Sequence, residues 1–227
     1  MKLKPIITGT TGMVGKGVLL ECLDSPAVES VLVINRQPLG IQHPKLREII
    51  HKDFYDLSAI RQELQGYNAC FFCLGISSVG LSNEDYEKIT YTLTLHVANT
   101  LLELNPDMTF CFVSGAGTAS NEQSRLAWAN IKGKTENAIR AMPFKASYMF
   151  RPGVIQPLRG VKAKSGLVNF LYIVLSPVIA VLKVTFPNSL TTSVRIGQAM
   201  INAVLHGYDK PVLENGDINK LAAFRES

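Results

Sequence analysis

The sequence predicts an α/β domain in which helices cover both faces of a doubly wound parallel sheet. Short apolar runs alternate with amphipathic helical segments almost without interruption, a pattern typical of parallel sheets. A glycine-rich turn also joins the first apolar run to the first helical segment. With 227 residues, of which 47% are hydrophobic and 18% charged, the chain is expected to form a single domain over residues 1–227.

Six strands are expected from the apolar runs. Val31 to Ile34 is a continuous apolar run, which is typical of a strand buried on both faces. The runs occupy residues 5–7, 31–34, 46–51, 70–74, 109–113 and 146–150. Between the fourth and fifth runs a long helix is predicted, capped by Ser82 or Asn83 and ending before Pro106. Its apolar stripe consists of Tyr86, Ile89, Leu93, Val97, Leu101 and Leu104.

The most informative motif is Thr-Gly-Thr-Thr-Gly-Met-Val-Gly at residues 8–15. Gly9 permits a tight turn, Gly12 lets the backbone approach a phosphate, and Gly15 lets the helix pack against the strand. A strand, turn and helix of this kind present free backbone N–H groups to a pyrophosphate; the alternative is a glycine-rich turn without a ligand. We predict a dinucleotide-binding loop of the Rossmann type. It comprises Gly9, Thr10, Thr11, Gly12, Met13, Val14 and Gly15.

The end of the second strand indicates which dinucleotide is bound. About 20 residues after the glycine motif, an acidic side chain would bind the ribose of NAD and repel the 2′-phosphate of NADP. This chain has Asn35 followed by Arg36, a neutral donor and a guanidinium, which suit a phosphate. NADP is therefore predicted in preference to NAD. The alternative is that Arg36 faces solvent at the start of a loop.

Further cofactor contacts are expected where the third and fourth strands end. The Asp53 side chain or the following amide of Phe54 is placed to hydrogen-bond the adenine, although Asp53 also suits a turn or a helix cap. Leu74 and Gly75 border the adenosine side, where a glycine leaves room for the ligand. Because the carboxyl ends of parallel strands share one edge, these residues and Ser114 are expected to line one crevice.

Several segments together resemble short-chain dehydrogenases/reductases of the atypical or extended branch. They are the glycine motif, Ser114 at the end of the fifth strand, Lys132-Gly133 and Arg151-Pro152-Gly153. Segments 132–136 and 150–154 are also similar to Tat-interacting oxidoreductase-like proteins and to bacterial NAD-dependent epimerase/dehydratase-like relatives. The resemblance covers nearly the whole chain and implies a Ser–Tyr–Lys mechanism. In it the serine holds a substrate carbonyl, the tyrosine transfers a proton, and the lysine binds the nicotinamide ribose and lowers the pKa of the tyrosine.

The chain departs from that pattern at the proton-transfer residue. Ser114 and Lys132 match, but Trp128 stands four residues before Lys132, where a tyrosine would share its helix face. An indole N–H donates a hydrogen bond but is neither a proton acid nor a base. We expect Trp128 to wall the nicotinamide pocket and Tyr91 to be the candidate for a relocated acid. The alternatives place Ser114 in a glycine-rich turn and Lys132 on an exposed helix surface.

An apolar segment after the sixth strand predicts a small C-terminal lid. Residues 167–184 are interrupted by Asn169, Pro177 and Lys183, so no run reaches the ~20 apolar residues of a membrane helix. Pro177 is expected to divide the segment into two short helices. We predict a lid within residues 156–191 that favours an apolar substrate. Attachment to a membrane surface is the alternative.

Composition sets further expectations about partners and location. The net charge of +5 fits an anionic ligand, but Lys and Arg are scattered, so no nucleic-acid partner is expected. Cys70 and Cys73 lie in a buried-strand pattern without the second pair that zinc would need, so no metal site is expected. Reduced thiols and a chain start that leads straight into the first strand predict a cytoplasmic protein without a signal peptide. A monomer or homodimer is expected.

Three functions are compatible with these features. The leading hypothesis is an NADP-dependent oxidoreductase of the atypical short-chain type, acting on an apolar carbonyl or alcohol. The second is a non-catalytic NADP(H)-binding sensor that acts through a protein partner, which the tryptophan at position 128 favours. The third, an epimerase or dehydratase of nucleotide sugars, would need both the missing tyrosine and a larger C-terminal domain.

Overall fold

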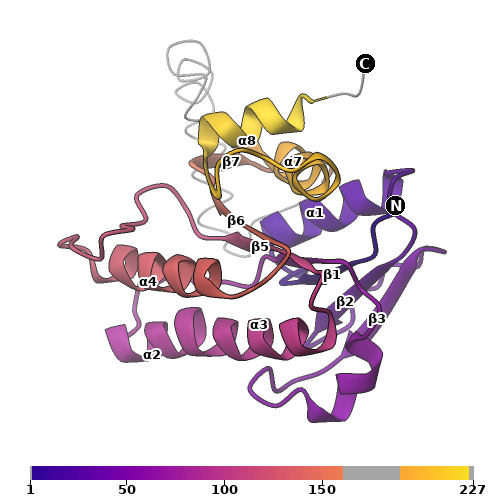
Figure 1. Cartoon of the computed structure of the whole chain (residues 1–227), viewed down its shortest axis with the longest axis horizontal. Coiled ribbons are helices and arrows are strands. Elements are labelled where there is room, and N and C mark those ends of the chain that lie inside the picture. Colours follow the sequence, from indigo (N-terminus) through magenta and orange to yellow (C-terminus); the bar gives the residue numbers. More distant parts are fainter. Residues whose placement is uncertain (1, 161–189, 225–227) are drawn as a thin grey trace.

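A seven-stranded sheet forms the centre of the structure (Figure 1), a computed structural model that describes residues 2–160 and 190–224. All strand pairs are parallel, in the order β3-β2-β1-β4-β5-β6-β9. The strands are β1 (Pro5–Thr8), β2 (Val31–Asn35), β3 (Leu46–Ile50), β4 (Ala69–Phe72), β5 (Thr109–Val113), β6 (Ala146–Arg151) and β9 (Val212–Glu214). The chain runs from β1 outward to β3, then returns beside β1 and continues in the other direction. This reversal between β1 and β4 confirms the predicted doubly wound parallel sheet.

Helices cover both faces of the sheet (Figure 1). One face carries α1 (Met13–Asp24), α7 (Ser193–His206) and α8 (Asn215–Ala222), and the other carries α2 (Asn83–Glu87), α3 (Leu93–Leu104) and α4 (Ala127–Ala141). Successive strand residues point to opposite faces. Ile7 and Phe71 accordingly pack with α1, whereas Ile6 and Phe72 pack with α3. Burial on both faces explains why the strands are continuous apolar runs.

The long helix predicted between the fourth and fifth strands contains a π-helical segment, η2 (Lys88–Thr92). Its start is as predicted, because the Ser82 hydroxyl accepts a hydrogen bond from the Asp85 amide at 3.0 Å. Four members of the predicted stripe are buried: Tyr86, Leu93, Val97 and Leu101. Ile89 and Leu104 are only half-buried. The extra residue of a π turn shifts the helical phase, so Thr90 takes the buried position beside Ile89.

Three short strands were not predicted. β9 extends the main sheet beyond β6, and β7 (Val154–Gln156) pairs in parallel with β8 (Leu190–Thr192). Each has only three residues, too few to show an alternating pattern. A short 3-10 helix, η1 (Ser58–Leu64), precedes β4. Two strands end one or two residues earlier than expected: β3 ends at Ile50 instead of residue 51, and β4 ends at Phe72 instead of residue 74.

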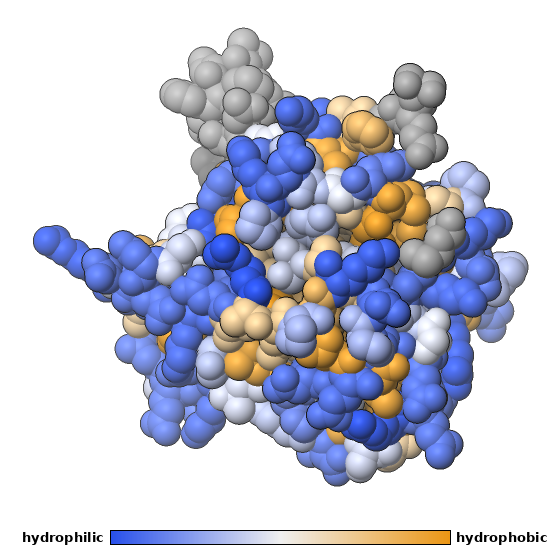
Figure 2. Space-filling view, in the orientation of Figure 1, coloured by the Kyte–Doolittle hydropathy of each residue, from blue (hydrophilic) through white to orange (hydrophobic). Residues whose placement is uncertain are grey.

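The predicted lid falls mostly within residues 161–189, which lie outside the described part of the chain. Within residues 2–160 and 190–224, none of the helices is both long and apolar enough to cross a membrane. Hydrophilic side chains cover most of the face shown in Figure 2, with apolar ones in smaller patches among them.

Candidate cofactor-binding and catalytic site

A cleft of about 810 Å³ lies at the carboxyl ends of the central strands. Strand-end residues that the sequence assigned to one crevice all line it: Gly9, Asn35, Asp53, Gly75 and Ser114. The cleft sits where the strand order reverses between β1 and β4, which is the usual ligand site in open parallel sheets. Of the other predicted cofactor residues, Thr11, Gly12, Met13, Val14, Arg36, Phe54, Leu74 and Lys132 also line the cleft.

The glycine turn has the shape that a pyrophosphate requires. Gly9 has a φ of +71°, and a Cβ there would lie 2.5 Å from the carbonyl oxygen of Cys73. A Cβ on Gly15 would collide with the Gly9 carbonyl, so Gly15 lets α1 approach β1. Gly12 caps α1 without a side-chain hydrogen bond, and no acidic residue occupies the first turn. No side-chain cap and no first-turn carboxylate thus competes for the first amides of α1, and these amides suit the anionic part of a dinucleotide.

Asn35 has a different role from the predicted one. Its side chain is buried, with 3% of the residue exposed. The Thr10 hydroxyl donates to Asn35 Oδ1 at 2.7 Å, and Asn35 Nδ2 donates to Glu48 Oε1 at 2.8 Å. Glu48 also accepts from the Leu39 amide at 3.0 Å. Asn35 therefore ties the glycine turn to the strands that follow, and Thr10 supports it from below the cleft surface.

The cations beside Asn35 remain available to a ligand. Arg36 and Lys52 are exposed and line the cleft, and within residues 2–160 and 190–224 neither forms an ion pair. Asp53, also on the lining, accepts a hydrogen bond from the Tyr55 amide at 2.8 Å, which is the turn geometry that the sequence left open as an alternative. Phe54 is buried beneath it. This end of the cleft is therefore electropositive, as a phosphate group would require.

Ser114 and Lys132 meet at the other end of the cleft. Lys132 Nζ donates to the main-chain oxygen of Ser114 at 2.8 Å. Burial lowers the pKa of Lys132 to about 8, and the attraction of Glu136 offsets this only in part. A Cβ on Gly133 would collide with the Ala119 carbonyl. The glycine in Lys132-Gly133 therefore lets α4 approach the loop after β5 and brings the lysine to the serine.

The structure separates the other two predicted catalytic residues from this end of the cleft. Trp128 is not among the described residues that line the cleft; the edge of its ring would lie 3.3 Å from a Cβ on Gly117. Tyr91 is likewise absent from the described lining. Its ring centroid lies 4.4 Å from Lys134 Nζ, and Lys134 forms an ion pair with Glu87 at 2.6 Å. Neither residue thus belongs to the described lining of the cleft, and their roles in catalysis stay predictions.

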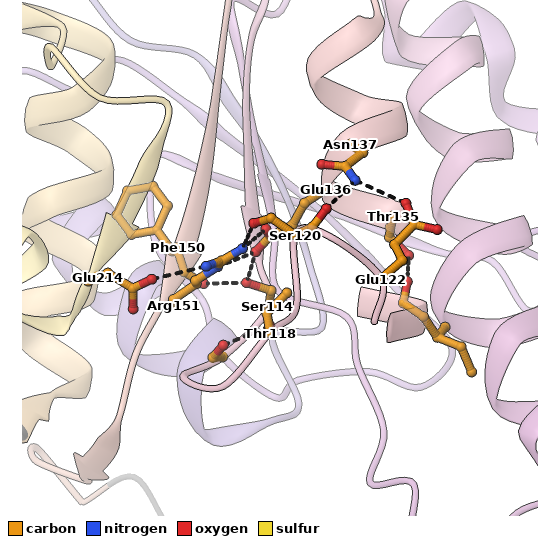
Figure 3. Close-up of polar contacts among 12 residues, drawn as sticks. Ser114, Thr118, Ser120, Glu122, Thr135, Glu136, Asn137, Phe150, Arg151 and Glu214 are labelled. Atoms are coloured by element: carbon orange, nitrogen blue, oxygen red, sulfur yellow. Dashed lines mark hydrogen bonds and ion pairs between the residues drawn. The ribbon is translucent and has the colours of Figure 1, made fainter. Parts of the chain in front are cut away.

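A buried ion pair next to Ser114 was not predicted from the sequence (Figure 3). Arg151 Nε donates to Glu136 Oε1 at 3.0 Å, and Arg151 Nη2 donates to Glu136 Oε2 at 2.5 Å. Arg151 also binds Glu214 at 3.0 Å and Ser120 at 2.6 Å. The hydrogen bonds to Glu136 raise the pKa of Arg151. The available sequence signal was a charged residue, Arg151, directly after the apolar run 146–150; Glu136 lies in the polar stretch 132–137 and gave no such signal.

The Ser114 hydroxyl belongs to this network. Ser114 Oγ lies 2.5 Å from Glu136 Oε1 and 3.2 Å from the main-chain oxygen of Phe150. Glu136 is fully buried and Arg151 is 8% exposed. Ser114 is thus held by a desolvated salt bridge rather than by a glycine-rich turn alone.

The cysteines and acidic residues do not form a metal site in the part of the chain that the structure describes. All four cysteines are free. Cys73 lies at the cleft, and burial raises its pKa, so the thiol stays protonated at neutral pH.

Comparison with known proteins places this fold and glycine turn in a family. The model of the NAD dependent epimerase/dehydratase family matches residues 6–138. The chain therefore belongs to the NAD dependent epimerase/dehydratase family, which confirms the resemblance to extended short-chain dehydrogenases/reductases. Membership assigns it to the NAD(P)-dependent, oxidoreductase-type class.

Within that class, similar named proteins are fungal. The chain is 30% identical over 169 residues to Protein FMP52, mitochondrial, of Debaryomyces hansenii, covering 73% of this chain and 72% of that protein. It is 26% identical over 206 residues to Protein FMP52-1, mitochondrial, of Scheffersomyces stipitis, covering 90% and 89%. These names contradict the predicted cytoplasmic location. That prediction was wrong because reduced thiols indicate a reducing compartment without identifying which one.

Solved structures share the fold at low sequence identity. A short chain dehydrogenase family protein from Francisella tularensis has a TM-score of 0.64 at 13% identity, covering 91% of this chain and 93% of that one. The Bordetella bronchiseptica enzyme WbmF, solved with NAD⁺, has a TM-score of 0.65 at 13% identity, covering 96% and 77%. At such identities the likeness shows the fold alone.

Proposed function

We propose that the chain is an NADP-dependent oxidoreductase that acts on an apolar alcohol or carbonyl compound. The observation that carries this proposal is the cleft itself. It combines an open helix N-terminus at Gly12, two unpaired cations of the described chain at Arg36 and Lys52, and the Ser114–Lys132 pair. The family supports the use of a dinucleotide, and the cations favour the one that carries a 2′-phosphate.

Each part of the cleft would hold one part of the cofactor. The first amides of α1 would bind the pyrophosphate, Arg36 and Lys52 the 2′-phosphate, and Lys132 the nicotinamide ribose. The bound cofactor supplies hydride transfer. Ser114 would orient the substrate oxygen beside Lys132, because both residues line the same end of the cleft.

Proton exchange at this site is assigned to Lys132. Tyr55 is the one tyrosine of the described chain that lines the cleft, and it follows Asp53 at the electropositive end. Lys132 has a pKa of about 8, so its ammonium can give up a proton and its amine can take one at neutral to mildly alkaline pH. In alcohol oxidation the neutral amine of Lys132 would receive the proton of the hydroxyl group, while the hydride leaves the carbon that bears this group.

Cofactor titration tests the first part of this proposal. Trp128 is the only tryptophan of the chain, and it packs on the loop that follows Ser114, so its fluorescence reports binding without background. NADPH should bind at least about tenfold more tightly than NADH, since one charge-assisted contact is worth about 1.5–3 kcal/mol. Equal affinities would refute the NADP assignment, and no binding of either would refute the proposed function.

A non-catalytic NADP(H)-binding sensor is the second candidate, because no tyrosine of the described chain lies beside Ser114 at the cleft. Under this alternative the protein binds NADPH but oxidises or reduces none of a panel of apolar alcohols and aldehydes. The Trp128→Tyr variant separates the candidates further. Position 128 precedes Lys132 by one helical turn, so the variant tests whether a tyrosine there can reach the Ser114–Lys132 end of the cleft and supply a proton; activity gained only in the variant favours the sensor.

The names of the fungal relatives support a mitochondrial location for this chain. Fractionation of cells that express the tagged full-length protein, with matrix and cytosolic marker enzymes measured in each fraction, tests that location.

A further inference from the structure

The hydroxyl proton of Ser114 is already committed to the protein. Ser114 Oγ has hydrogen-bond contacts with a carboxylate oxygen of Glu136 at 2.5 Å and with the carbonyl oxygen of Phe150 at 3.2 Å. Both of these atoms accept hydrogen bonds, and a serine hydroxyl has one proton to donate. Within the described structure, therefore, the Ser114 proton points into the protein, and Oγ offers only lone pairs to a molecule in the cleft.

Glu136 cannot reverse this arrangement. Both of its carboxylate oxygens accept from Arg151, at 3.0 and 2.5 Å, so the pair is ionic and neither oxygen has a proton to offer Ser114. The residue is fully buried, which excludes solvent as a replacement donor. A Ser114 hydroxyl that rotated toward the cleft would leave a buried anion with one donor fewer, which is unfavourable.

Lys132 completes the pattern of donors and acceptors. Its Nζ is bonded to the main-chain oxygen of Ser114 at 2.8 Å, and an ammonium has two further protons to donate. Both residues line this end of the cleft, which thus has an acceptor in Ser114 Oγ and a donor in Lys132 Nζ. While Lys132 is an ammonium, as it mainly is below its pKa of about 8, an alcohol oxygen satisfies both groups, because it accepts from the lysine and donates to the serine. A carbonyl oxygen satisfies only the lysine.

We propose that Ser114 meets the substrate as a hydrogen-bond acceptor, so that this site selects alcohols over the corresponding carbonyl compounds. Glu136 acts as the positioning residue, because it draws the Ser114 proton away from the cleft. The inference rests on the proposed oxidoreductase function for its substrate class. It reverses the role that the family resemblance implied, in which the serine donates to a carbonyl.

The test compares cyclohexanol with cyclohexanone, two apolar probes that differ in this donor. Cyclohexanol is titrated into the NADPH complex and cyclohexanone into the NADP⁺ complex, so that neither can react. Each probe is measured by calorimetry in the wild type and in Ser114→Ala, which cancels the difference in cofactor. The variant should bind cyclohexanol about tenfold more weakly and cyclohexanone equally well, as expected for one lost hydrogen bond.

Two further variants separate positioning from general damage. Glu136→Gln can donate from its amide to Ser114 and release the serine proton, so the preference for cyclohexanol should shrink or reverse; a purely structural effect would weaken both probes alike. Ser120→Ala removes a different partner of Arg151, which lies 2.6 Å away, and should leave both affinities unchanged. If Glu136→Gln fails to fold, Ser114→Ala still decides the question.

The outcomes also separate this inference from the proposed function. A wild type that binds no NADPH overturns the proposed function. Two results overturn the acceptor role of Ser114. One is a wild type that binds NADPH but does not bind cyclohexanol at millimolar concentration. The other is a Ser114→Ala variant whose affinity for cyclohexanone falls at least as much as its affinity for cyclohexanol.

Discussion

At the scale of single residues, the proposed selectivity for NADP rests on two exposed cations rather than on the buried amide beside them. Asn35 is buried and hydrogen-bonded to Thr10 and Glu48, whereas Arg36 and Lys52 reach the cleft without an ion-pair partner in the described chain. Of the two carboxylates near this end, Glu48 accepts from the Asn35 amide and the Leu39 main chain, and Asp53 accepts from the Tyr55 main chain. This arrangement favours a phosphate over a free ribose hydroxyl.

Arg36→Gln should therefore weaken NADPH binding by about ten- to hundredfold, because one or two charge-assisted hydrogen bonds are lost. NADH binding should change by less than about threefold. Titration of both cofactors into wild type and variant by fluorescence checks this prediction. Arg61→Gln, which breaks an exposed ion pair with Glu103, is the matched control and should alter neither affinity. A variant that loses both cofactors equally would contradict the assignment.

The lowered pKa of Lys132 predicts a dependence of activity on pH. Burial shifts this pKa from its usual value near 10.5 to about 8, so the side chain loses its proton as the pH rises through about 8. In the proposed reaction the neutral amine accepts the hydroxyl proton of the alcohol. We expect kcat/KM for oxidation to rise with pH and to level off above pH about 8, and kcat/KM for carbonyl reduction to fall over the same range.

Lys132→Met should remove this inflection together with most of the activity. Lys132→Arg keeps the positive charge but does not titrate in this range, so it should retain cofactor binding and lose the inflection. An inflection that persists in either variant would assign the titration to another group.

At the scale of elements, the helix α4 supplies two residues of the site, Lys132 and Glu136, which point to different parts of it. Gly133 lets the helix contact the loop at Ala119, which delivers Lys132 to the cleft and Glu136 to the core beneath it. The π segment η2 has a comparable effect on the neighbouring helix, since it turns Ile89 toward the cleft. Sequence periodicity predicted the helix between the fourth and fifth strands and the family resemblance implied the helix that bears Lys132, but neither indicated these contacts.

Gly133→Ala should therefore destabilise the protein although alanine is the better helix former. The added methyl group meets the Ala119 carbonyl well inside contact distance, and overpacking of this kind costs about 1–3 kcal/mol. Urea unfolding measures the change. Gly75→Ala, whose Cβ would meet no atom within 4 Å, should leave the free energy of unfolding within about 0.5 kcal/mol of the wild type. A stabilised Gly133→Ala variant would show that α4 can shift freely.

At the scale of the whole molecule, Arg151 joins three elements through a single side chain. It extends from the end of β6 to Glu136 on α4 and to Glu214 on β9, and Figure 3 shows these side chains converging between the helix and the outer strand. β9 is a short edge strand of three residues. The ion pair therefore helps to fix the edge of the sheet as well as Ser114.

Arg151→Met should cost about 3–5 kcal/mol of stability, because it leaves Glu136 buried without its counter-ion. Lys210→Met removes an exposed partner of Asp217, 3.1 Å away, and should cost at most about 1 kcal/mol. Chemical denaturation of both variants, followed by circular dichroism, makes the comparison. A loss below about 1 kcal/mol for Arg151→Met would mean that Glu136 is solvated or protonated in that variant.

Much of the fold followed from local pattern. Six of the seven strands of the main sheet, the glycine turn and the crevice at the strand ends were predictable, because buried parallel strands are continuous apolar runs. β9 was missed because a strand of three residues is too short to show a recognisable hydrophobic pattern. The phase change at Thr90 was missed because a π turn has no sequence signature of its own.

Residues close together in the chain were enough to predict the doubly wound sheet, the family and the expected site of a dinucleotide. The contacts of Ser114, Asn35, Trp128 and Tyr91 could be read only from the tertiary structure. Ser114 meets Glu136 and Phe150, which are 22 and 36 positions away, and Asn35 meets Thr10 at a separation of 25. Hydrogen-bond direction depends on which partners the fold brings within about 3 Å, and no local spacing encodes that choice.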